Sequence, residues 1–196
     1  MKKIIVYRFI ALSVLSLVLL QSCKKKKEEA DPYADVTGHY FSIRQFALDE
    51  WQTFRGSPFT ILKTVREDKK TDSSFTTSDT LNWGVIFKTF FETEISDRKY
   101  LGQYTYNQFE DNQEGTRNFY YKANDEDMFT QKLLISADQV NNKVKGIYIE
   151  TYKKNIWGAT LQKLYYAPMK TIQIQTDEKP TVGARKFKVV QYYFMR

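Results

Sequence analysis

Apolar residues recur at helical spacing in a segment that starts just after residue 40. The i, i+3, i+4 intervals predict an amphipathic helix over about residues 42–55. Ser42 can cap its start, and Gln45 three residues later completes a capping-box pattern. Gly56 is expected to end the helix. The apolar stripe consists of Ile43, Phe46, Ala47, Trp51 and Phe54.

A second stripe with the same spacing follows after residue 78. It predicts a second amphipathic helix over about residues 79–95, with Ser78 or Asp79 as its N-cap. The segment from Trp83 to Phe91 is also rich in aromatic and β-branched residues, so a strand there is the alternative. The second stripe consists of Trp83, Ile86, Phe87, Phe90 and Glu94.

The rest of the chain alternates between apolar and polar residues, as strands do. Turn-rich pieces separate the alternating runs, and such short connections predict antiparallel neighbours. The expected fold is α+β: one globular domain over residues 36–196, with the two helices packed on a curved antiparallel β meander of roughly seven to nine strands. The candidate strands are residues 59–67, 71–77, 101–109, 117–122, 129–137, 143–152, 159–166, 171–176 and 185–194.

Adjacent aromatic residues occur within several of these strands. Because neighbours along a strand point to opposite faces, one member of each set should lie in the core and another on the outer face of the sheet. An outer row of tyrosines could bind a glycan or a peptide, or could stabilise the sheet through cross-strand pairs. The sets are Phe119-Tyr120-Tyr121, Tyr165-Tyr166 and Tyr192-Tyr193-Phe194.

The start of the chain carries a targeting pattern. Two lysines precede an apolar run over residues 9–20. The run ends at Leu20, and Gln21-Ser22-Cys23 follow it. This segment resembles a bacterial lipoprotein signal peptide with its lipobox. The resemblance implies that residues 1–22 are removed and that Cys23 becomes an N-terminus carrying acyl chains such as palmitate. An uncleaved transmembrane helix would place four lysines on the far side of the membrane, against the positive-inside rule.

The net charge changes once this leader is set aside. The whole chain has a charge of +7, but three basic residues belong to the leader and four form the run Lys24–Lys27. From Glu28 onward, 23 basic residues face 23 acidic ones. This balance argues against nucleic acid as a partner. Residues 23–35 are charged and lack apolar periodicity, which predicts a lipidated, flexible tether.

Few residues are suited to catalysis or metal binding. Cys23 is the only cysteine and His39 the only histidine, so a Cys–His nucleophile and a zinc cluster are not expected. The acidic groups in predicted turns are expected to be solvated. They could serve a hydrolase only if two met across a groove, and calcium binding by Asn124 with Asp125–Asp127 lacks EF-hand spacing. No catalytic residue, metal or cofactor is predicted. The turn groups are Glu110 with Asp111 and Asp125-Glu126-Asp127, and a further pair, Glu92 with Glu94, lies in the second predicted helix.

The order of features along the chain also resembles a group of lipoproteins common in Bacteroidota-type envelopes. After the lipobox and tether come Gly38-x-Tyr40-Phe41, the two helices, and a late run from Leu161 to Pro168. The resemblance implies an α+β domain and supplies no catalytic residues.

Together these patterns predict a lipoprotein of the bacterial cell envelope, lipid-anchored at the outer membrane. They do not decide between the periplasmic face and the cell surface. The expected role is a non-enzymatic binding or structural module. Its partners would be the lipid bilayer, through acylated Cys23, and an apolar ligand, a glycan or an envelope protein. An envelope glycan hydrolase using paired carboxylates is the alternative.

Overall fold

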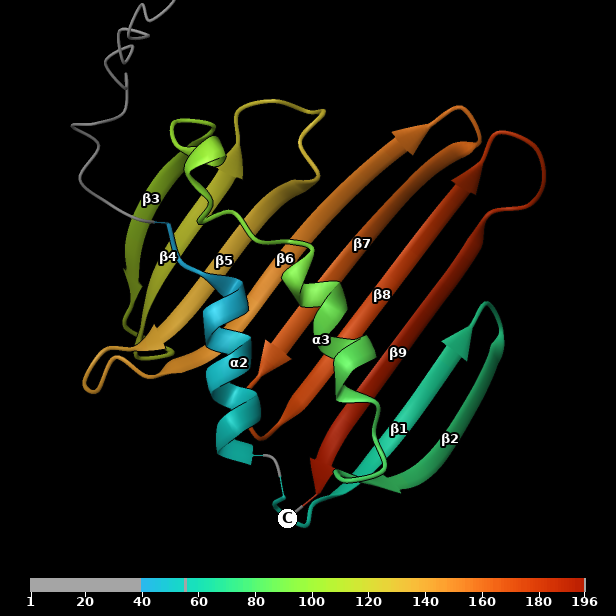
Figure 1. Ribbon diagram of the computed structural model, residues 1–196, viewed down its shortest axis with the longest axis horizontal. Coiled ribbons are helices and arrows are strands. Elements are labelled where there is room, and N and C mark those ends of the chain that lie inside the picture. Colours follow the sequence, from blue (N-terminus) through green and yellow to red (C-terminus); the bar gives the residue numbers. More distant parts are fainter. Residues whose placement is uncertain (1–39, 55, 196) are drawn as a thin grey trace, which may run out of the picture. The chain divides into compact units, whose positions relative to one another are not determined.

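The computed structural model describes residues 40–54 and 56–195, and this part of the chain is an α+β domain (Figure 1). It contains two α-helices, one short 3-10 helix and nine strands. All nine predicted strands are present, with bounds shifted by a few residues. The elements are α2 (Ile43–Phe54), β1 (Thr60–Glu67), β2 (Lys70–Thr77), α3 (Trp83–Phe91), the 3-10 helix (Arg98–Tyr100), β3 (Tyr104–Asp111), β4 (Thr116–Ala123), β5 (Thr130–Asp138), β6 (Val144–Asn155), β7 (Gly158–Ala167), β8 (Thr171–Pro180) and β9 (Lys186–Met195).

The nine strands form one antiparallel sheet in the order β2-β1-β9-β8-β7-β6-β5-β4-β3. Strands β3 to β9 are the predicted meander, because each pairs with the next along the chain. The β1–β2 hairpin joins this meander beside β9, where Thr60 lies opposite Met195 and Glu67 opposite Lys188. The prediction of a curved sheet was wrong: the sheet is open and uncurled, because β2 and β3 lie at opposite edges of the order and do not pair.

The first helix begins as predicted but uses a different partner for its cap. The backbone N–H of Gln45 donates to Ser42 Oγ at 3.1 Å, which is half of a capping box. The Gln45 side chain does not complete the box, because it donates to Asp49 Oδ1 at 2.8 Å. Glu94, which lies beyond α3, supplies the second acceptor at this helix end. A long-range contact therefore completes the local motif.

The second helix is shorter than the predicted range of residues 79–95, and the strand alternative for this segment was wrong. Its N-cap is Asn82, whose side chain accepts from the Val85 N–H at 3.2 Å. Neither Ser78 nor Asp79 caps it. The Ser78 carbonyl instead accepts the indole N–H of Trp83 at 2.6 Å, and this contact holds the residues before Asn82 outside the helix.

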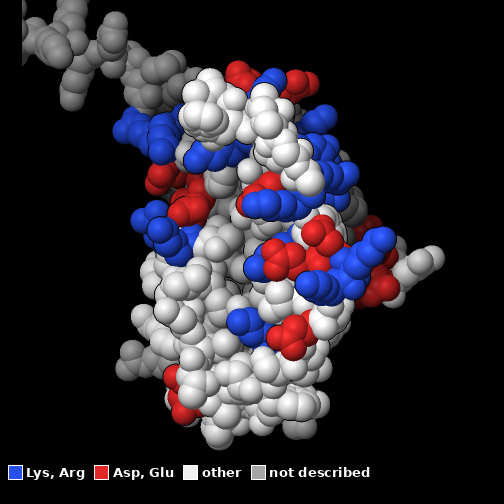
Figure 2. All heavy atoms as spheres, turned by 90° about the vertical axis from the view of Figure 1, so that its right-hand side faces the viewer, with Lys and Arg blue, Asp and Glu red and all other residues white. Residues whose placement is uncertain are grey.

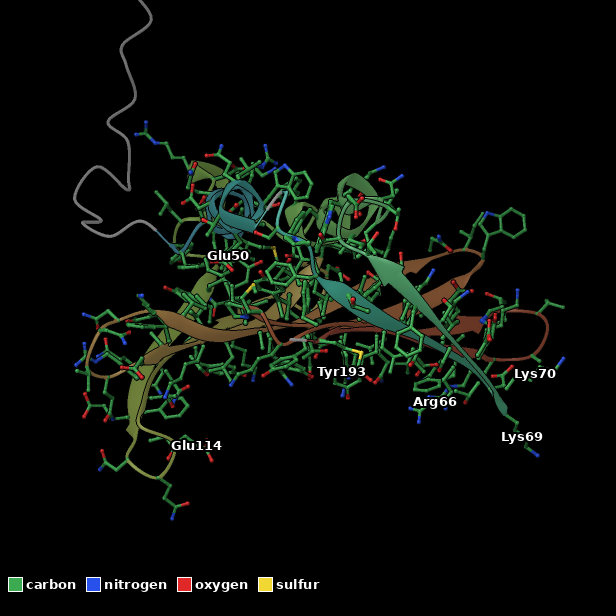
Figure 3. The ribbon with its side chains drawn as sticks, turned by 90° about the horizontal axis from the view of Figure 1, so that it is seen from below. Glu50, Arg66, Lys69, Lys70, Glu114 and Tyr193 are labelled. Atoms are coloured by element: carbon green, nitrogen blue, oxygen red, sulfur yellow. The ribbon has the colours of Figure 1, made fainter. Side chains whose placement is uncertain are left out.

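Both helices lie on the same face of the sheet and cover part of it (Figures 1 and 3). Each apolar stripe turns toward the sheet: Ile43 and Ala47 of α2 are buried, as are Ile86 and Phe90 of α3. The helices are less central than predicted, because the sheet supplies most of the fully buried side chains. Those from the sheet are Ile61, Leu133, Ile135, Ile147, Ile149, Leu164, Ile172 and Thr151.

The prediction for adjacent aromatics is confirmed. Tyr121, Tyr166 and Tyr192 are buried in the core. Their neighbours Tyr165 and Tyr193 are exposed, and Figure 3 shows Tyr193 on the side of the sheet away from the helices. The alternation of side chains along a strand therefore decides which tyrosine of each set contributes to stability and which is available at the surface.

Candidate ligand-binding site

The predicted lipidation site, Cys23, lies outside the described residues, as do the signal peptide, the tether and His39. Their assignments stay predictions. In the part of the chain that the structure describes, no helix is both long enough and apolar enough to cross a bilayer.

Most of the predicted acidic groups serve their own turns or pair locally. Asp111 accepts the backbone N–H groups of Gln113 and Glu114 at 3.0 and 3.1 Å. Glu110 forms a salt bridge with Arg117, with 3.3 Å between Oε1 and Nη2. Asp125 accepts the backbone N–H of Asp127 at 2.8 Å. Among the described residues, no three His, Cys, Asp or Glu side chains cluster so as to hold a metal ion.

Glu94 is the exception, because it is buried and holds two elements together. Its Oε2 accepts from Ser42 Oγ at 2.9 Å and from the Arg44 N–H at 2.8 Å, while Oε1 accepts from the Ser96 N–H at 2.8 Å. Burial opposes ionisation, but these hydrogen bonds outweigh it and hold the pKa of Glu94 below its ordinary value. No local pattern indicates this role, since the helical spacing assigned Glu94 to an apolar stripe.

A groove lies where strand β6 extends past strand β5. The last β5–β6 pair is Thr130 with Thr151, and the Tyr152 N–H then donates to the Phe129 carbonyl at 2.8 Å. Residues 153–155 still pair with β7 but have no β5 partner in the described chain. The groove beside this overhang has a volume of about 790 Å³. We call it the β6 groove; Glu92, Asp127, Phe129, Thr151, Tyr152, Lys153, Lys154, Thr160 and Gln162 line it.

The lining of the β6 groove combines both signs of charge with aromatic rings. Glu92 and Asp127 come from two acidic groups that are more than thirty residues apart in the sequence, and the fold places both at the same groove. Two lysines lie on the strand side. Glu92 also approaches the Lys88 ammonium at 3.9 Å, and both side chains are largely exposed. A ligand in this groove would therefore meet carboxylates, ammonium groups and hydroxyls together.

The space between the helices and the sheet is nearly filled. The hollow there has a volume of about 10 Å³, roughly the minimum for a single water molecule. Tyr166 donates its hydroxyl to Glu50 Oε2 at 2.9 Å, and Figure 3 shows Glu50 between the helix layer and the sheet. Burial raises the pKa of Glu50, and the hydrogen bond from Tyr166 opposes that rise.

A larger apolar hollow, of about 280 Å³, lies between the two helices. Aromatic rings form its walls: those of Trp83 and Phe87 stack at 5.5 Å, and those of Trp51 and Trp83 lie tilted to each other, also at 5.5 Å. Leu48 and Phe91 complete much of its rim. The hollow is small compared with the β6 groove and carries no charged group in its lining.

On the outer face of the sheet, a cross-strand row through Tyr165 and Tyr148 spans all nine strands. Tyr148 in this row donates to Glu150 Oε1 at 2.6 Å, and Lys132 approaches the same carboxylate at 2.9 Å. These contacts support a stabilising role for Tyr148. The side chain of Tyr165 is exposed to solvent. The row is Ser73, Thr64, Gln191, Gln173, Tyr165, Tyr148, Leu134, Tyr120 and Asn107.

Comparison of the chain with protein-family models, with curated proteins and with solved structures gives no match in any of the three. The functional argument therefore depends on the chain's own residues.

Proposed function

We propose that this protein is a lipid-anchored binding module of the bacterial cell envelope that holds a charged glycan in the β6 groove. The leader that ends at Cys23 supports the anchor. The observation that carries the binding role is the groove itself, where aromatic rings, carboxylates and ammonium groups share one hollow of about 790 Å³. Pockets of this size are typical of ligand sites.

The groove chemistry favours an envelope glycan with charged substituents. Phe129 and Tyr152 offer apolar surface for the faces of sugar rings, while Thr160 and Gln162 offer hydrogen bonds to hydroxyl or acetamido groups. The lysines and carboxylates suit substituents of opposite sign. Peptidoglycan fragments combine these groups, because their amino sugars carry short peptides with free amines and carboxylates.

The anchor is tested by replacing the acylated residue. With Cys23→Ala, the protein should leave the detergent-extractable membrane fraction, because a pair of acyl chains anchors far more strongly than a single one. The matched control is Ser57→Ala in the body of the domain, which should fractionate like the wild type. Retention of the Cys23→Ala protein in membranes washed with high salt and alkaline carbonate, which removes peripheral contacts, would refute the lipid anchor.

The groove is tested by filling it. Gln162→Trp places an indole in the β6 groove, and Gln173→Trp makes the same change on the outer face of the sheet. Purified full-length protein is sedimented with isolated peptidoglycan sacculi. We expect Gln162→Trp to weaken co-sedimentation at least tenfold and Gln173→Trp to leave it unchanged. Equal binding by both variants, or no binding by the wild type, would contradict the groove assignment.

A second function is favoured by one observation, the presence of Glu92 and Asp127 at the same groove. Two carboxylates across a bound glycan are the catalytic pair of glycosidases. Incubation of sacculi with the wild type, Glu92→Gln and Asp127→Asn separates the two functions. A hydrolase would release soluble reducing ends that both substitutions abolish, whereas a binding module would release none.

A further inference from the structure

Two neighbouring hairpin tips carry large apolar side chains that the domain leaves almost wholly in water. At the β6–β7 tip, Ile156 and Trp157 are 81% and 77% exposed, and at the β8–β9 tip Val182 is 89% exposed. Both tips lie at the same end of the sheet (Figure 1). We call Ile156, Trp157 and Val182 the tip cluster.

Hydrogen bonds join the two tips into one ordered unit. The Thr181 N–H donates to the Trp157 carbonyl at 2.8 Å, and Thr181 Oγ1 donates to the Ile156 carbonyl at 3.1 Å. The Trp157 N–H donates to Asn155 Oδ1 at 2.9 Å. Gly158 packs so closely on the other hairpin that a Cβ there would lie 2.5 Å from the Lys179 carbonyl oxygen. The backbone is therefore fixed while the apolar side chains project.

Basic residues surround the tip cluster. Residues 153–160 and 177–188 contain six basic and two acidic residues, a net charge of +4. One of the two acids, Asp177, is buried in a bidentate pair with Arg185, and those hydrogen bonds lower the pKa of Asp177. Figure 2 shows the side of the molecule that carries this end of the sheet, with basic side chains over its upper part and acidic ones among them. The basic residues are Lys153, Lys154, Lys179, Arg185, Lys186 and Lys188.

We propose that the tip cluster inserts into the surface of an anionic lipid bilayer. Tryptophan favours the interface between headgroups and acyl chains, and isoleucine and valine gain by leaving water. The basic residues meet anionic headgroups, where an unpaired one contributes roughly a fivefold gain in binding. Arg185 and Lys188 contribute less, because they pair with Asp177 and Glu67. A protein partner fits less well, because stable protein interfaces bury about 800 Å² on each side around a packed centre, whereas here only two narrow tips project.

This contact does not require acylation at Cys23, and it shares only Lys153 and Lys154 with the β6 groove. Seventeen residues run from Cys23 to His39, and a chain of that length reaches at most about 60 Å. If Cys23 is acylated, an anchor this many residues away leaves open which part of the domain faces the membrane. Insertion of the tip cluster selects the orientation in which this end of the sheet faces the lipid.

The test follows the environment of Trp157 in the full-length protein, purified as it occurs in its host. The protein is placed on vesicles of phosphatidylcholine alone or mixed with phosphatidylglycerol, and brominated acyl chains serve as the quencher. Subtracting the spectrum of Trp157→Phe removes the emission of Trp51 and Trp83. We expect the Trp157 component to be blue-shifted and at least half quenched on anionic vesicles, and much less on neutral ones.

A matched pair of variants separates insertion from mere proximity. Val182→Asp should abolish the quenching of Trp157, whereas Val140→Asp should keep it, because Val140 is 92% exposed at the distant β5–β6 turn. Both positions are solvent-exposed, so both variants should fold, as circular dichroism would verify. An unquenched Trp157 on anionic vesicles, or equal effects of the two variants, would overturn the inference. Quenching of Trp157 that persists in Cys23→Ala would uphold the tip contact, because it would occur without an acyl chain.

Discussion

The buried carboxylate of Glu94 offers the most direct test of how the helix layer is held. Its two oxygens accept three hydrogen bonds, from the Ser42 hydroxyl and the backbone N–H groups of Arg44 and Ser96. In Glu94→Gln one oxygen becomes an NH₂ group, which must face at least one of these donors. The substitution keeps the side-chain shape and removes the acceptor, so it isolates the electrostatic contribution.

The expected loss follows from the number of bonds affected. A hydrogen bond to a charged group contributes about 1.5–3 kcal/mol, and an unpaired buried donor costs a similar amount. Loss of the acceptor at the α2 N-terminus adds to this. We expect Glu94→Gln to lower the free energy of unfolding by about 3 kcal/mol, which for a domain of this size corresponds to a fall in Tm of about 6–12 °C.

Thermal and urea unfolding followed by circular dichroism would measure this difference. Glu92→Gln is the control, because Glu92 is largely exposed and its pair with Lys88 is 3.9 Å long; it should change stability by less than about 0.5 kcal/mol. The pKa of Glu94 is lowered on folding, so its contribution is fully present above the unfolded value of 4.5 and disappears as pH falls through the folded pKa. Equal stability of the two variants at pH 7 would refute the capping role.

Three further predictions concern the backbone, the core and the carboxyl group of Glu50. Gly158→Ala should lower the free energy of unfolding by more than about 2 kcal/mol, because φ at this position is 148° and the new Cβ would meet the Lys179 carbonyl. Gly56→Ala, in open space at φ 79°, should lower it by about 1 kcal/mol. Urea unfolding compares the two variants. Trp83→Ala should cost about 3–5 kcal/mol by the same assay, since the indole is buried and its N–H is bonded. The pKa of Glu50 is raised on folding, so its contribution is most favourable below pH 4.5 and is lost as pH rises through the folded pKa; Glu50→Gln should remove that loss from a profile of stability against pH.

The strands could be located from the sequence because alternation and turn residues are local patterns. Alternation and turn residues located all nine strands, and side-chain parity predicted which of Tyr165 and Tyr166 is buried. The start of α2 at Ser42 was also predictable, since its first hydrogen bond spans three residues.

The errors and omissions arose where distant residues decide the outcome. The pairing of β1 with β9 joins segments more than 120 residues apart. The alternation of apolar and polar residues within a strand does not indicate which other strand it pairs with. The shorter α3 follows from the bond between Trp83 and the Ser78 carbonyl. The β6 groove depends on how far β6 extends past β5, and strand ends are the least certain part of a sequence-based assignment. A carboxylate such as Asp127, expected in a solvated turn, therefore also lines a groove.

The position of β9 within the sheet has a consequence for biogenesis. This strand is ninth in the sequence but third in the sheet, bonded to β8 on one side and β1 on the other. During synthesis or export from the N-terminus, the β1–β2 hairpin emerges early and must wait for β9 before it gains its neighbour. A polypeptide cut short before residue 186 would leave that hairpin and the edge of β8 unpaired, the kind of free strand edge that invites aggregation. The order of strands thus makes arrival of β9 the step that completes the sheet.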